Sequence, residues 1–114
     1  MNGIKAAKQK LVASEERLLD TRRRVIERVR NAWQNLETAK QTATILRNQE
    51  ALAQKFLELA RKERKAGKRS LLDVLNGETT LINAQSEAAS AEADVEIFSY
   101  ELLRAIGVLE VSSK

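Results

Sequence analysis

The chain has 114 residues, enough for one domain, and 32% of them are charged while only 4% are aromatic. It contains no Pro, Cys or His and only four Gly. This composition is typical of long helices. It excludes a disulfide framework, thiolate or imidazole metal sites, and the commonest general base. We therefore predict no catalytic residues, no cofactor and no metal.

Membrane insertion and secretion signals are also missing from the sequence. No segment approaches the ~18 consecutive apolar residues of a membrane-spanning helix. After residues 1–3 an amphipathic pattern begins at once, without the apolar stretch of a signal peptide. We expect a soluble chain that is either cytosolic or a piece of a larger protein.

Charge is divided unevenly along the chain. Residues 1–66 carry 16 Lys and Arg against 8 Asp and Glu, a net charge of +8, whereas residues 67–114 carry 4 against 8, a net charge of −4. Pairing between the two halves explains this division as well as an external polyanion does. Nucleic-acid binding is the weaker interpretation, because no glycine-rich or aromatic setting for base contacts surrounds the basic cluster of Arg22, Arg23, Arg24, Arg28 and Arg30.

The first half of the chain repeats every seven residues. Starting from Leu11, every seventh position is apolar: Leu18, Val25, Ala32, Ala39, Leu46, Ala53 and Ala60. A second row follows four residues on, with Val29, Leu36, Ala43 and Leu57. The pattern predicts a helix over about residues 4–66, ~95 Å long, with a coiled-coil seam.

A turn is predicted over about residues 67–70. Gly67 suits the left-handed position just past a helix C-terminus, and the cations before it complement the helix dipole. Ser70 is the expected N-cap of a second helix over about residues 71–108, with Asp73 completing an acidic capping box. This helix has its own apolar row of Val74, Leu81, Ala88, Val95, Leu102 and Leu109. The predicted fold is all-α, a long antiparallel two-helix coiled-coil hairpin.

The two predicted helices differ in length. Pairing outward from the turn brings Leu109 near Arg28, so we expect Leu11, Leu18 and Val25 to lack a partner within the chain. Exposed apolar surface of this kind favours association with other helices. A trimer, a dimer or another assembly fits this expectation equally well.

The segment AGKRSLLDVLNGETTLINAQSEAASAEADVEIFSYELLRAIGVL resembles the C-terminal repeat of the TolC family of trimeric outer-membrane efflux and secretion channels. The spacings G-x-R-x-x-x-D-V-L, T-L-x-N-A and L-x-x-x-x-G-x-L carry the resemblance. It implies one hairpin of a trimeric periplasmic α-barrel, with the turn at the end farthest from the outer membrane. The family's membrane-embedded part and its other helical repeat would belong to the parent protein.

The resemblance also implies roles for residues near the turn. Asp73 matches an aspartate that lines the constricted entrance, and Asn76 matches a second such aspartate but is uncharged. Arg69 matches an arginine that holds the closed tip together, whereas Arg64 stands where members carry a tyrosine of the same network. The tip residues expected to meet the hairpins of a periplasmic adaptor are Ala66, Gly67, Lys68, Arg69 and Ser70.

Simpler explanations exist for each of these residues. Helix capping explains Asp73, and backbone geometry explains Gly67. The function implied by the resemblance is a non-catalytic tunnel-wall segment for efflux or type I secretion, with an inner-membrane transporter as an indirect partner. The alternative is a general coiled-coil oligomerisation or interaction module. A hydrolase that uses Asp73 and Glu78 has no recognisable cleft in the sequence.

Overall fold

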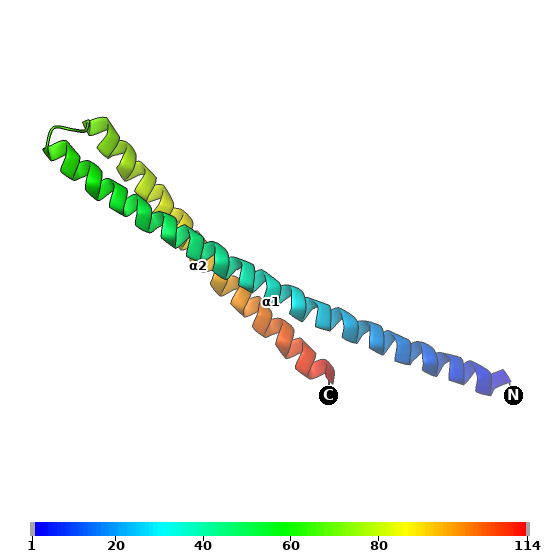
Figure 1. Cartoon of the computed structure of the whole chain (residues 1–114). Coiled ribbons are helices and arrows are strands. Elements are labelled where there is room, and N and C mark those ends of the chain that lie inside the picture. The colour runs from blue at the N-terminus through cyan, green and yellow to red at the C-terminus, as the bar shows by residue number, and fades with distance from the viewer. Residues whose placement is uncertain (1, 114) are drawn as a thin grey trace.

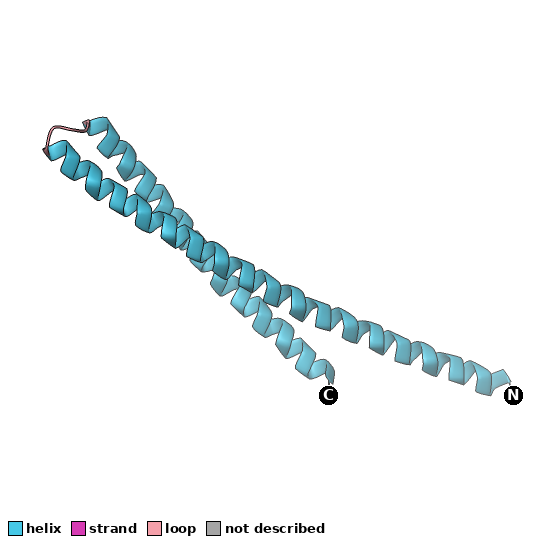
Figure 2. Ribbon diagram, viewed as in Figure 1, coloured by secondary structure: helices cyan, strands magenta, loops and turns pink. Residues whose placement is uncertain are grey.

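Two helices make up nearly all of the structure, a computed structural model that describes residues 2–113. Helix α1 runs Asn2–Lys65 and helix α2 runs Leu71–Ser113, joined by residues 66–70. Figure 1 shows the helices leaving the turn side by side, crossing, and then diverging while the N-terminal part of α1 continues alone. The molecule measures 98 × 20 × 13 Å. Figure 2 shows only helix and loop in the described residues, which confirms the predicted helical hairpin.

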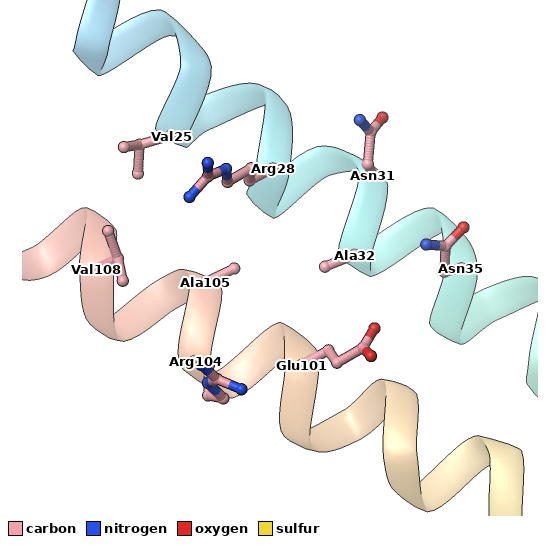
Figure 3. Close-up of a pocket in the computed structure, with 9 residues that line it drawn as sticks. All are labelled: Val25, Arg28, Asn31, Ala32, Asn35, Glu101, Arg104, Ala105 and Val108. Carbon is pink, nitrogen blue, oxygen red and sulfur yellow. The ribbon is translucent and has the colours of Figure 1, made fainter.

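Helix α2 extends further than its apolar pattern predicted. Its predicted end was residue 108, but it continues to Ser113. Gly107 does not stop the helix, because among the described residues only Gly67 has a positive φ. Val25 was expected to lack a partner, yet it is only 7% exposed, because Val108, near the predicted end of α2, lies across from it (Figure 3).

The core is one seam of mostly small apolar side chains between the helices. Near the turn, Leu57, Ala60, Val74 and Leu81 form a cluster against which Ala53 packs. The other buried residues continue the seam away from the turn: Val25, Ala32, Leu36, Ala39, Ala43, Ala88 and Ala91. Ala-rich seams let helix axes approach closely. Because there are only two helices, each buries one stripe and leaves the rest of its surface uncovered.

A row of small residues on α2 lies beside the predicted apolar row. Gly77, Ala84 and Ala91 follow one another at seven-residue spacing, and Gly77 and Ala91 are buried. A Cβ atom at Gly77 would lie 3.3 Å from Leu57 Cδ1 and 3.6 Å from the Phe56 ring. The missing side chain therefore allows the close approach of the helices just below the turn.

Two ion pairs join the basic helix to the acidic one. Arg47 bonds to Glu92, and Arg61 Nη2 lies 3.2 Å from Glu78 Oε1. The two arginines are 14 positions apart on α1, as are the two glutamates on α2, so both pairs lie along one edge of the seam. Pairing within the chain thus accounts for part of its divided charge.

Much apolar surface remains uncovered beyond the end of α2. Leu11 is 61% exposed and Leu18 is 70% exposed, as their place in the pattern predicted. Ile4, Val12, Leu19 and Ile26 are exposed on the same segment of α1. Within residues 2–113, neither helix has a stretch long and apolar enough to cross a membrane.

The bond between Arg47 and Glu92 should make stability depend on pH. Arg47 lowers the pKa of Glu92 mainly through their side-chain hydrogen bond. A carboxyl whose pKa is lowered by folding stabilises the fold above its unfolded pKa of about 4.3, and this contribution is lost as the pH falls through the folded pKa. We expect Glu92→Gln to lower the Tm at pH 7, and this loss should shrink as the pH falls below about 4.

Circular dichroism melts at pH 7 and at lower pH measure the loss of Tm that Glu92→Gln causes. Glu96→Gln is the matched control, since Glu96 has no ionic partner among residues 2–113 and the substitution is chemically identical. Equal loss of Tm in the two variants at pH 7 would contradict the assignment of the effect to the Arg47 pair.

Candidate functional site at the hairpin tip

The end of α1 is closed by a Schellman motif. Gly67 has a φ of 75°, the Lys68 N–H donates to the Glu63 carbonyl at 2.8 Å, and the Gly67 N–H donates to the Arg64 carbonyl at 2.9 Å. These bonds satisfy the carbonyl groups that the helix end leaves free. The backbone therefore requires glycine at the tip, whatever partner meets it.

The start of α2 has the predicted N-cap but not the predicted capping box. Ser70 Oγ accepts a hydrogen bond from the Asp73 N–H at 3.2 Å. The Asp73 carboxylate does not complete a capping box, because it is turned toward Arg69, with Oδ2 3.9 Å from Nη1. Asp73 therefore interacts with its neighbour in the turn as well as capping the helix through its backbone.

Arg69 contacts residues on both sides of the turn. Its Nε donates to Glu63 Oε2 at 2.7 Å, and its guanidinium carbon lies 5.3 Å from the centroid of the Phe56 ring. The Arg69 side chain is only 26% exposed. One guanidinium thus joins the last turns of α1 to the first turn of α2 through a charge-assisted bond, a cation–π contact and a weaker contact with Asp73.

The remaining tip cations are free of such contacts. Lys62, Arg64, Lys65 and Lys68 are exposed, and none has an ionic partner within residues 2–113. Arg64, which stands where members of the family carry a tyrosine of the closing network, is exposed in this chain.

The other polar residues near the turn have separate partners, or none, within residues 2–113. Asn76 is exposed and has no side-chain hydrogen bond within the described part of the chain. Glu78 pairs with Arg61, so Asp73 and Glu78 are held by different arginines and do not act together. No three carboxylates gather into a possible metal site in residues 2–113.

A second feature, absent from the sequence predictions, is a groove where the helices diverge (Figure 3). Its larger part has a volume of about 350 Å³. Val25, Ala32, Ala105 and Val108 form its floor, and Arg28, Asn31, Asn35, Glu101 and Arg104 form its rim. A smaller part of about 230 Å³ shares Asn35 and reaches Thr42 and Asp94. The sequence indicates this groove only through polar residues at seven-residue spacing: Asn35 with Thr42, and Asn31 with Thr38.

The positive φ of Gly67 predicts opposite effects for two glycine substitutions. Gly67→Ala forces a side chain into the left-handed region and should destabilise the chain by about 1 kcal/mol. Gly107→Ala lies within a helix, where a new Cβ meets no atom within 4 Å, and should stabilise it by up to about 1 kcal/mol. Urea unfolding at one protein concentration measures both, and destabilisation by Gly107→Ala would contradict this account.

The Arg69 contacts predict a larger effect than those of another tip arginine. Arg69→Ala should lower the free energy of unfolding by about 1 to 2 kcal/mol, because it removes a partly buried charge-assisted bond and a cation–π contact. Arg61→Ala is the control, since its pair with Glu78 is more exposed, at 51% and 40%, and should change stability by at most about 0.5 kcal/mol. Equal losses of unfolding free energy in the two variants would show that the contacts of Arg69 stabilise the chain no more than an exposed ion pair does.

Comparison with known proteins shows which proteins and which family this chain is similar to. Over 84 residues the chain is 39% identical to the outer membrane efflux protein BepC of Brucella suis biovar 1 (strain 1330), covering 74% of the chain and 18% of that protein. Over 106 residues it is 28% identical to the outer membrane protein TolC of Escherichia coli (strain K12), covering 93% of the chain and 22% of that protein.

A relative from Salmonella enteritidis, also described as the outer membrane protein TolC, is 26% identical over 106 residues. The chain thus spans about a fifth of the length of the curated relatives that it matches. No solved structure was found to match it. The model of the family described as outer membrane efflux protein matches residues 1–108, which is most of the chain. The chain belongs to the outer membrane efflux protein family.

Proposed function

We propose that this chain is a periplasmic tunnel-wall segment of a TolC-like outer-membrane channel and that its turn docks a periplasmic adaptor. One observation carries the docking proposal: the tip is rigidly closed by backbone and Arg69 contacts, yet it exposes four cations without partners within residues 2–113. A surface that is both ordered and unneutralised favours binding, because little conformational entropy is lost on docking. The transport served is efflux or type I secretion.

Association with other helices supports the tunnel-wall role. The uncovered apolar residues of α1, among them Leu11 and Leu18, are more exposed than a stable single rod favours. In the proposed trimer the neighbouring helices of the channel cover this surface. The inner-membrane transporter would contact the chain only through the adaptor.

At the channel entrance, Asp73 is the proposed selectivity residue. Three Asp73 carboxylates around a narrow opening would favour cations. In the single chain Asp73 lies near Arg69 of its own turn, and this contact would reduce the negative potential of the ring. Adaptor docking can open the tip only by binding the open state more tightly than the closed one. Arg64 and Asn76 would line this region without adding negative charge.

A general interaction module is the second candidate, since the overhang of α1 supports any coiled-coil association equally well. The two candidates differ at the tip. A general module would use the exposed apolar rows and would be indifferent to Lys68, whereas a docking tip would not.

Site-specific cross-linking tests the docking role. A photo-reactive amino acid at Lys68 should cross-link to the periplasmic adaptor of the same genome, whereas the same group at Lys5, at the far end of α1, should not. Lys68→Glu should weaken adaptor binding about three- to tenfold, the value of one exposed charge reversed. Adaptor binding that is insensitive to Lys68→Glu, together with no cross-link from Lys68, would favour the general module.

A further inference from the structure

One apolar row of α1 has an uncovered part and a part that lines the groove between the diverging helices. The uncovered part lies on residues 2–24, here called the overhang, and its members are at least 61% exposed: Ile4, Leu11 and Leu18. At the same seven-residue spacing, the row continues with residues that line the groove: Val25, Ala32 and Ala39. An exposed apolar row and an open apolar groove therefore adjoin each other on one helix.

A second copy of the chain, turned end for end, covers both features at once. When the two copies lie antiparallel with Leu18 of one opposite Val25 of the other, Leu11 comes opposite Ala32. The third pair of the row follows at the same spacing. The arrangement is reciprocal under a two-fold axis, because placing one overhang in the groove of the other copy also places the second overhang in the first groove.

Charge favours this arrangement over the contact of two overhangs with each other. The overhang carries seven Lys and Arg against three Asp and Glu, whereas residues 91–113 of α2, beside the groove, carry one against five. An overhang in the groove therefore meets a helix of opposite charge. The arginines at positions 22–24 of both copies come near the two-fold axis, where their repulsion opposes the contact and the pair of Arg24 with Asp20 reduces it.

Individual charges match in spacing as well as in sign. Lys5 precedes Glu15 by ten residues in the overhang, and Asp94 precedes Arg104 by ten residues on α2, where both line the groove. The overhang runs parallel to α2 of the other copy, so the same alignment of the two rows brings each cation within about one helical turn of a carboxylate. All four residues are exposed and lack an ionic partner within residues 2–113.

We infer that the chain forms an antiparallel dimer in which the overhang of each copy fills the groove of the other, with Lys5 facing Asp94 and Glu15 facing Arg104. Each half of this dimer has three helices side by side, which covers apolar surface that two helices leave exposed. The inference goes beyond the proposed function and does not rest on it, because the helices of the proposed channel would compete for the same surface.

Sedimentation equilibrium of the 114-residue chain tests the inference, with an expected mass of twice the 12.8 kDa of one chain. Lys5→Glu should weaken dimerisation about tenfold, because the dimer contains this contact twice. Lys5→Glu/Asp94→Lys should restore the affinity, since it exchanges the two charges. Lys55→Glu is the matched control, because it makes the same substitution on an exposed residue of α1 outside the overhang and the groove. Its dimerisation should equal that of the unmodified chain.

Disulfide cross-linking shows the orientation of the two copies, because the chain itself contains no cysteine. A mixture of Lys5→Cys and Asp94→Cys chains should form a disulfide between copies. These two positions are about 50 Å apart along the rod within one chain, and the distance between parallel copies is similar. Lys5→Cys mixed with Gln85→Cys is the control and should form none, since residue 85 lies about 14 Å further along α2.

Three results would each overturn the inference: a mass of one chain or of three, a Lys5→Glu variant that dimerises as well as the unmodified chain, and equal cross-linking to positions 94 and 85. The proposed adaptor docking is tested separately at Lys68. The turn lies outside the dimer contact, so failure of one proposal is distinguishable from failure of the other.

Discussion

Two helices in contact can cover only one stripe of each other, and this constraint governs the molecule. The seam of Ala, Gly and a few larger residues lets the helices lie close, but it buries little surface per residue. Further stabilising contacts lie at the turn and beside the seam. At the turn they are the capping hydrogen bonds and the Arg69 contacts, and beside the seam they are the two ion pairs between the helices. The uncovered stripes are then available for partners.

The helices, their antiparallel arrangement and the caps follow from local rules that the sequence displays directly. Apolar residues at every seventh position fix which face is buried, and glycine followed by Ser70 marks the turn. These features depend on residues close together in the chain. The end of α2 lies beyond the predicted residue 108, at Ser113, because Gly107 does not adopt the positive φ that would end the helix.

Contacts at the tip were less accessible to sequence reasoning. The resemblance placed Arg69 in a network that closes the channel, but it could not show that Glu63 and Phe56 hold it within its own hairpin. Whether a guanidinium meets a neighbouring turn depends on side-chain directions, which a residue pattern does not specify. The division of the tip cations into paired and unpaired groups, on which the docking proposal depends, is likewise a property of the folded chain.

The glycine opposite Leu57 has a mechanical consequence for the whole rod. Two helices held close together resist bending more than one helix does, whereas the part of α1 beyond the end of α2 has no second helix beside it. A load applied at the turn would therefore bend this single-helix part of α1 more than the paired part. The flexible part of this segment would lie tens of ångströms from the turn.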